Sequence, residues 1–119
     1  MTINLTNALP NSFFPSSGEI LQVAGISESR AIEILSPGFQ SFIGHASFAQ
    51  IISERTGIEI PTNRAFAPSP MTTKQPTLVA AVQPPRRLAE GEVWSEEDIL
   101  TMPITWVLVG TPESLAAFN

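Results

Sequence analysis

The chain contains a single histidine, His45, within the stretch FIGHASF that covers residues 42–48. This histidine follows an apolar run and a glycine, and it precedes a segment whose apolar residues have helical spacing. In α/β proteins, ligand sites lie where the carboxyl ends of strands face the N-termini of helices. The first backbone N–H groups of such a helix, those of Ala46, Ser47 and Phe48, have no partner inside it and can receive a phosphate.

Two roles for His45 are therefore open. A bare helix N-terminus disfavours the imidazolium form, whereas a bound phosphate places a negative charge beside the ring and reverses that preference. A protonated His45 beside a phosphate would act as a general acid. The alternative is a neutral histidine that caps the helix or packs, which is the more common outcome for such a position.

A second group of charged residues lies in the stretch RRLAEGEVWS, residues 86–95. The stretch falls between an apolar strand and a helix start, so we expect it to be a connecting loop. Arg86 and Arg87 are adjacent and could clamp a phosphate with paired hydrogen bonds, with Glu90 and Gly91 nearby. Simple solvation of these charges is the equally weighted alternative.

Other residues with chemical potential have stronger structural explanations. The carboxylates of Glu96, Glu97 and Asp98 could bind a metal, but acidic residues in a first helical turn also stabilise the helix dipole. Trp94 and Trp106 could stack on a base, although Trp106 lies inside an apolar strand and is expected in the core. The sequence has no phosphate-binding loop, dinucleotide-binding glycine pattern or serine nucleophile elbow.

Composition narrows the function classes. The net charge of −5, from 11 acidic and 6 basic residues, argues against binding duplex nucleic acid, which requires a broad basic surface. The absence of cysteine excludes disulfides and thiolate metal sites, and one histidine disfavours a zinc site within a subunit. No apolar run is long enough to span a membrane, and the N-terminus lacks signal-peptide features, so we expect a cytoplasmic protein without a cofactor.

The hydrophobic pattern predicts alternating strands and helices. Residues 2–7, about 19–26, 39–44, 77–82 and 104–110 are expected strands, whereas residues 30–35, 46–56 and 96–102 are expected helices. Ser27 and Gly57 would cap the first two helices, residues 112–119 would fray or form a short helix, and residues 68–76 would form a mobile loop. This order predicts one α/β domain over residues 1–119, a mixed five-stranded sheet flanked by helices.

Four segments together resemble a known family. They are LTNAL (5–9), FIGHASF (42–48), TGIEIPTNRAF (56–66) and RLAEGEVWSEEDI (87–99). Their order and spacing, over roughly residues 3–109, resemble the viral ring nucleases, whose pattern is L-T-N-A-F, I-G-H-x-S-T, N-R and R-L-x-E-G-x-x-L-S-x-E-E. These small type III anti-CRISPR proteins were first known as uncharacterised proteins of archaeal viruses, and bacterial CRISPR loci encode relatives.

The resemblance implies a homodimer that binds cyclic tetra-adenylate, the second messenger of type III CRISPR systems. Without a metal, the family cuts this ring to linear di-adenylates that end in a 2′,3′-cyclic phosphate, which switches the signal off. By resemblance, His45 is the general acid, and Arg87 and Glu90 hold the scissile phosphate and support catalysis. Together with the helix start and the arginine pair, the resemblance gives these ligand-binding residues: Asn7, Asn11, Ser12, Gly44, Ala46, Ser47, Arg64 and Arg86.

The chain also departs from the family pattern. Phe48 stands where the family has threonine, Leu9 and Pro10 end the first motif, and SPMTTKQP replaces an acidic turn. These differences bear on ligand choice and rate. Three hypotheses follow: a ring nuclease, a sponge that binds a cyclic nucleotide without cutting it, and a structural or interaction protein in which His45 only caps a helix.

Overall fold

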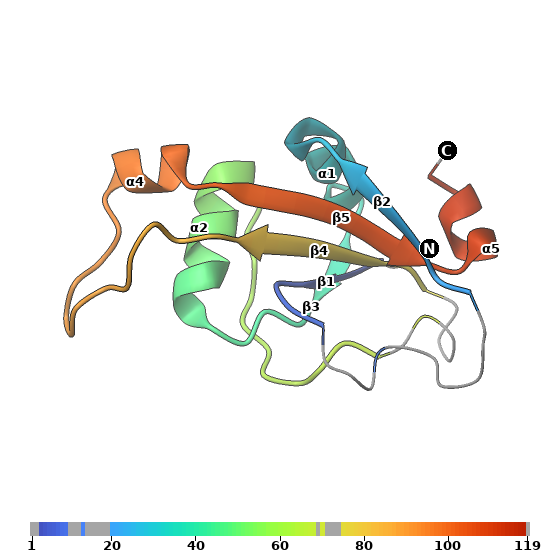
Figure 1. The fold of residues 1–119 in the computed structure, drawn as a ribbon, viewed down its shortest axis with the longest axis horizontal. Helices are drawn as coiled ribbons and strands as arrows, with labels where there is room; N and C mark the ends of the chain where they lie inside the picture. The colour runs from blue at the N-terminus through green and yellow to red at the C-terminus, as the bar shows by residue number, and fades with distance from the viewer. Residues whose placement is uncertain (1–2, 10–12, 14–19, 69, 71–74, 119) are drawn as a thin grey trace.

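The computed structural model describes residues 3–9, 13, 20–68, 70 and 75–118, and within them five strands form one mixed sheet (Figure 1). The strands follow the sheet order β2-β5-β4-β1-β3. Their bounds are β1 Ile3–Thr6, β2 Gln22–Ile26, β3 Phe39–Ser41, β4 Thr77–Val82 and β5 Ile104–Gly110. The described helices are α1 Glu28–Leu35, α2 Ala46–Thr56, α4 Glu96–Thr101 and α5 Pro112–Ala116. The predicted mixed five-stranded α/β fold is confirmed.

Strand directions decide where a site can form. β1 runs parallel to both β3 and β4, whereas β5 runs antiparallel to β4 and β2. The carboxyl ends of β1, β3 and β4 therefore meet at one edge of the sheet. Asn7 follows the first of these strands, Gly44 and His45 come shortly after the second, and the 83–94 loop follows the third.

One face of the sheet carries α1 and α2, which lie behind the strands in Figure 1. Because side chains alternate along a strand, every second residue points into this helical layer. The largest core cluster joins strand residues to the buried sides of the two helices. Its fully buried members include Leu5, Leu78, Ala80, Ala31 and Ile52, each 0% exposed.

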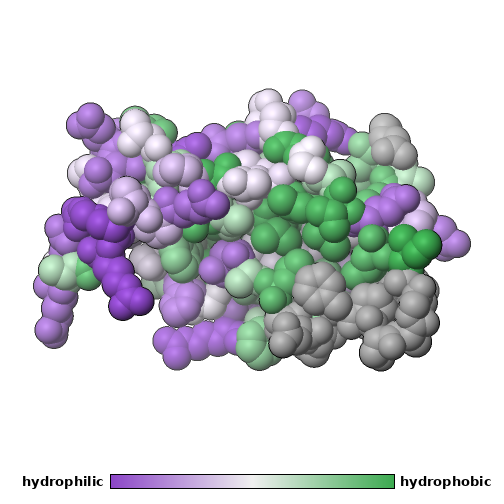
Figure 2. Space-filling view, viewed as in Figure 1, coloured by the Kyte–Doolittle hydropathy of each residue, from purple (hydrophilic) through white to green (hydrophobic). Residues whose placement is uncertain are grey.

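The opposite face has a smaller apolar cluster. Val79 and Val109 are buried there against Phe13, with Val107 partly buried beside them. Figure 2 shows this side, where hydrophobic residues gather across the middle and right of the molecule and hydrophilic residues cover the end that carries α4. Of the described helices, α1 and α2 thus pack on the face opposite to this smaller cluster.

Helix ends follow the sequence signals. The Ser27 hydroxyl accepts a hydrogen bond from the Arg30 amide at 3.2 Å, and Gly57 ends α2 in a left-handed conformation with φ 73°. Ser95 and Asp98 form a reciprocal capping box at the start of α4. Ser27, Gly57 and the start of α4 are therefore correct as predicted.

The first three predicted strands are shorter than expected, and β1 ends at Thr6 and not at Asn7. β3 ends at Ser41 and not at Gly44, because the Ile43 carbonyl accepts from the amide of Asn63, at 2.9 Å, and not from a neighbouring strand. The second strand begins at Gln22, and Glu19 lies outside the described residues, as do residues 69 and 71–74 of the predicted mobile loop. Residues 112–116 form the short helix α5. In the part of the chain that the structure describes, no helix has the length and apolar character to cross a membrane.

Candidate functional site

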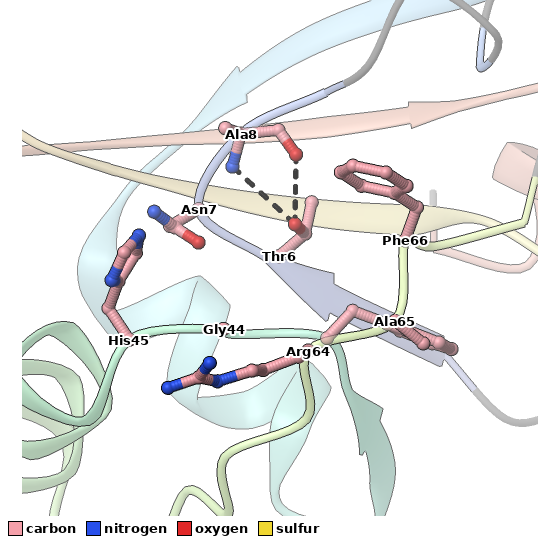
Figure 3. Close-up of a pocket in the computed structure, with 9 residues that line it drawn as sticks. Thr6, Asn7, Ala8, Gly44, His45, Arg64, Ala65 and Phe66 are labelled. Atoms are coloured by element: carbon pink, nitrogen blue, oxygen red, sulfur yellow. Dashed lines mark hydrogen bonds between the residues drawn. The ribbon is translucent and has the colours of Figure 1, made fainter.

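A hollow of about 380 Å³ lies at the sheet edge where β1 and β3 end (Figure 3). This volume is within the range of about 300–1,000 Å³ that is typical of small-molecule pockets. Three separate segments contribute its walls, namely the turn after β1, the end of β3 with the start of α2, and the 64–66 segment. The lining residues are Thr6, Asn7, Ala8, Phe42, Gly44, His45, Arg64, Ala65 and Phe66.

The turn after β1 directs Asn7 into this hollow. The Thr6 hydroxyl donates to the Ala8 carbonyl at 2.9 Å and accepts from the Ala8 amide at 3.4 Å, which closes a tight local turn. Asn7 is at the centre of this turn, and its side chain points toward the ring of His45 in Figure 3. Thr6 therefore fixes a polar side chain that could contact a ligand in the hollow.

Asn63 places Arg64 beside Gly44. Its side-chain amide donates to the Ser41 carbonyl at 3.0 Å, its side-chain oxygen accepts from the Ala65 amide at 3.1 Å, and its backbone amide donates to Ile43 at 2.9 Å. These bonds fasten an irregular segment along the end of β3. The Arg64 guanidinium then extends toward the start of α2, on the same side as His45.

His45 is the N-cap residue of α2, and it is exposed. Its backbone is extended, with φ −114° and ψ 126°, and its side chain makes no capping hydrogen bond. Within the described residues, no group accepts from the amides of Ala46, Ser47 or Phe48, so these donors remain available. The Phe48 ring meets the imidazole in a T-shaped contact, with ring centroids 5.7 Å apart.

A second, larger hollow of about 840 Å³ lies on the other side of His45. It is walled by α2 and by the loop that joins β4 to α4. Its lining mixes apolar side chains with two guanidinium groups: His45, Phe48, Pro84, Arg86, Arg87, Leu88 and Trp94. His45 thus separates two hollows, and each contains at least one arginine.

Arg86 is engaged within its own loop. Its guanidinium donates to the Glu92 carboxylate at 2.7 Å and lies 5.2 Å from the centre of the Trp94 ring. The hydrogen bond from Arg86, with a second from the Ala89 amide, lowers the pKa of Glu92, and the same bond to Glu92 raises the pKa of Arg86. Arg86 was predicted to contact ligand, but the structure gives it an intramolecular partner while it also lines the second hollow.

The predicted site residues divide into five groups. Asn7, Gly44, His45 and Arg64 line the first hollow, and Arg86 and Arg87 line the second with His45. Ala46 and Ser47 are exposed at the start of α2. Glu90 is exposed and lines neither hollow, and the other two predicted residues, Asn11 and Ser12, lie outside the described residues.

The sequence did not indicate two residues that shape the first hollow, Asn63 and Phe66. Asn63 lies within the motif TGIEIPTNRAF, but its role depends on contacts with the distant β3. Phe66 lines the first hollow with 77% of its surface exposed. Only its place two residues after Arg64 could have indicated it.

The acidic residues 96–98 belong to the helix start. Asp98 accepts from the Ser95 amide as part of the capping box, and Glu96 and Glu97 occupy the same first turn. Among the described residues, no group of three histidine, aspartate or glutamate side chains has a geometry that could hold a metal ion. The capping box at Asp98 therefore supports the interpretation that these three acidic residues stabilise the start of α4.

Comparisons with known proteins identify relatives. A family model described as STIV B116-like matches residues 7–106, a span that includes every residue lining the two hollows except Thr6. Among solved structures, the fold is similar to B116 of Sulfolobus turreted icosahedral virus, with a TM-score of 0.72 and 21% sequence identity. That match covers 92% of this chain and 99% of the viral protein. A search of curated proteins found no match.

Proposed function

The chain belongs to the STIV B116-like family, and we propose that it is a metal-independent ring nuclease that cleaves cyclic tetra-adenylate. The observation that carries the proposal is the position of His45. This residue stands at an open helix N-terminus, between a hollow that holds Asn7 and Arg64 and another that holds Arg87. The viral origin of the structurally similar B116 agrees with the family resemblance of the sequence motifs.

The site offers what cleavage of an RNA-like ring requires. The free amides at the start of α2 and the Arg64 guanidinium can neutralise a phosphate. The ribose 2′-hydroxyl is tethered next to the scissile phosphorus, so orientation can supply much of the rate acceleration. No external nucleophile is needed from the protein.

The reaction then proceeds in one displacement. The 2′-oxygen bonds to phosphorus while the bond from phosphorus to the 5′-oxygen breaks, and the 2′-hydroxyl proton passes to solvent. His45 donates its proton to the departing 5′-oxygen as general acid. Arg87 stabilises the charge on the phosphoryl oxygens. Two such cuts turn the ring into two linear di-adenylates that end in a 2′,3′-cyclic phosphate.

A homodimer is part of this proposal. Cyclic tetra-adenylate can adopt two-fold symmetry, and a C2 dimer presents two copies of every group. The second subunit would supply the second histidine for the second cut.

A non-cleaving sponge is the second candidate, and two features favour it. Glu90 lines neither hollow, so the residue expected to support catalysis is away from His45. Phe48 contacts the imidazole where the resembled family has threonine, and this contact restricts how the ring can turn toward a leaving group. Under this alternative the same groups bind the ring and release it unchanged.

Incubation with cyclic tetra-adenylate in EDTA, followed by chromatography, separates the candidates. The ring nuclease yields linear di-adenylates, and His45→Ala abolishes cleavage while calorimetry still detects binding. The sponge yields intact ring, with no effect of His45→Ala on the ligand recovered. If neither binding nor cleavage occurs, both candidates are wrong.

A further inference from the structure

The loop of residues 83–94 has little support from the rest of the fold. The Gln83 amide donates to the Pro103 carbonyl at 2.9 Å, where the β4–β5 ladder ends. Beyond it, within the described residues, no backbone–backbone hydrogen bond joins residues 84–94 to other segments. The loop and α4 lie at the end of the molecule that Figure 2 shows as hydrophilic. Trp94 packs against the buried cluster of Ile51, Ile99 and Met102. Side-chain contacts within the loop hold the rest of it.

Side chains from three positions close this loop on itself. The Arg86 guanidinium lies over the Trp94 ring at 5.2 Å and donates to Glu92 at 2.7 Å, so it joins the start of the loop to its end. The same Glu92 oxygen accepts from the Ala89 amide at 2.9 Å. We call Arg86, Glu92 and Trp94 the loop clasp.

A tight turn lies inside the clasp. The Glu92 amide donates to the Ala89 carbonyl at 2.9 Å, and Gly91 adopts a left-handed conformation with φ 77°, which glycine accepts without steric cost. Glu90 is the other central residue of this turn, and Arg87 is next to Arg86. The clasp therefore brackets both residues that the resemblance assigns to the phosphate.

We propose that Glu92 and Trp94 are positioning residues, which hold Arg86 and thereby fix the pose of Arg87 and Glu90. This inference rests on the proposed function, because it concerns how the loop meets the ring. Glu92 and Trp94 touch no reacting atom. Their effect is to present the Arg87 guanidinium toward the second hollow before ligand arrives, which lowers the ordering cost of binding and reaction.

The ion pair of the clasp is exposed, whereas Trp94 is partly buried. The Arg86 and Glu92 side chains are 50% and 36% exposed, and exposed ion pairs contribute little to global stability. Loss of the ion pair in Glu92→Ala should therefore leave the thermal unfolding of the sheet nearly unchanged. It should appear as faster local exchange in the loop and as a slower chemical step, since small misplacements of catalytic groups are costly.

The test compares two disruptive variants with two conservative ones and a control. Glu92→Ala and Trp94→Ala break the clasp, whereas Glu92→Gln keeps an acceptor and Trp94→Phe keeps an aromatic face. The control is Glu33→Ala, which removes an exposed ion pair with Arg30, 3.0 Å long, on α1. Each variant is examined by fast amide-exchange NMR, by calorimetry with cyclic tetra-adenylate, and by single-turnover cleavage of that ring.

The decisive signal is the Ala89 amide in Trp94→Ala, because this substitution removes neither the amide nor its acceptor. We expect its exchange to accelerate several-fold, with cleavage about tenfold slower and affinity changed less than the rate. Trp94→Phe, Glu92→Gln and Glu33→Ala should stay near wild type. Trp94→Ala also removes the packing of Trp94 against the cluster that contains Ile99. Glu92→Ala breaks the clasp without removing that packing.

Unchanged Ala89 exchange in Trp94→Ala, or wild-type single-turnover rates in both disruptive variants, would overturn the inference. If the wild-type protein leaves the ring intact, the proposed function has failed on its own. In that case, faster exchange of the Ala89 amide in Trp94→Ala and weaker ring binding by Glu92→Ala would support a clasp that orders this loop for binding. Unchanged exchange and unchanged affinity would overturn it.

Discussion

The two sides of His45 are built by different means. On one side, Asn7 and Arg64 are placed by short turns fastened to parallel strands, through Thr6 and Asn63. On the other side, Arg87 sits on a loop that is closed by two exposed side chains, Arg86 and Glu92, and the partly buried Trp94. The first wall is part of the sheet edge, whereas the second is attached to it only through β4 and α4.

The two sides of His45 should therefore respond differently to substitution. A wall fixed by side-chain hydrogen bonds to the backbone of β3 and of neighbouring turns can hold a phosphate in a constant place relative to the helix N-terminus. A wall held by the clasp presents Arg87 to the ring, while its exposed ion pair adds little to global stability. We therefore expect substitutions on the sheet side to affect stability and binding together, and substitutions on the loop side to affect rate more than stability.

We expect the largest effect on cleavage from a substitution of His45, which lines both hollows. His45→Asn should reduce cleavage by a factor of about 10² to 10⁴, the usual contribution of a general acid. The same substitution should not lower stability, because asparagine is a favoured N-cap and His45 makes no capping bond. Single-turnover cleavage and thermal unfolding measure the two effects. A variant that both cleaves normally and unfolds earlier would make His45 a structural residue.

On the sheet side, Asn63→Ala should weaken ring binding about tenfold and lower stability by about 1–3 kcal/mol, since it removes two side-chain hydrogen bonds in a partly buried place. Calorimetry and denaturant unfolding provide the measurements. Thr62→Ala, at the exposed neighbouring position, is the matched control. Normal affinity in a destabilised Asn63→Ala protein would show that Arg64 does not depend on this anchor.

Where the loop enters α4, Ser95→Ala removes the capping box and should lower stability by about 1 kcal/mol. Cleavage should fall less than in Glu92→Ala, because Ser95 lies outside the clasp. Denaturant unfolding and single-turnover cleavage compare the two variants. A larger loss of cleavage in Ser95→Ala would mean that the helix end, and not the clasp, orders the loop.

The smallest effect is the pH response of the clasp. Because the pKa of Glu92 is lowered below its ordinary value of 4.5, chiefly by the Arg86 hydrogen bond, the contribution of this pair is complete above that value. It is lost as pH falls through the lowered pKa. Besides Glu92, the charge of Asp98 acts on Arg86. Trp94 emission, taken as the difference from Trp94→Phe, should change only below 4.5, and Glu92→Gln should remove the change. A transition above 4.5 would contradict this assignment.

Most of the fold could be predicted because local signals and tertiary structure agree. Ser27, Gly57 and Ser95 mark helix ends that the structure confirms, and Trp106 is 3% exposed inside β5, as its apolar surroundings predicted. The end of β3 was predicted wrongly. Alternation continues to Gly44, but the partner of Ile43 is Asn63, which is not on a strand.

The site was predictable only in part. The place of His45 between a strand and a helix indicated this residue, and the family resemblance indicated Asn7 and Arg64. All three line one hollow. The engagement of Arg86 by Glu92 and Trp94 could not be foreseen, because an adjacent arginine pair gives no sign of which member faces a ligand. The ion pair between Arg55 and Glu28, 2.9 Å long, could not be predicted either, because 27 residues separate the two in the sequence.

The central claim is that His45 protonates a leaving oxygen in a ring cut without a metal. The most direct test is to incubate the wild-type protein and His45→Ala with cyclic tetra-adenylate in EDTA and to separate the products by chromatography. We predict linear di-adenylate with a 2′,3′-cyclic phosphate from the wild type, and intact, bound ring with His45→Ala. Intact ring after prolonged incubation with the wild-type protein, or equal cleavage by the variant, would contradict the claim.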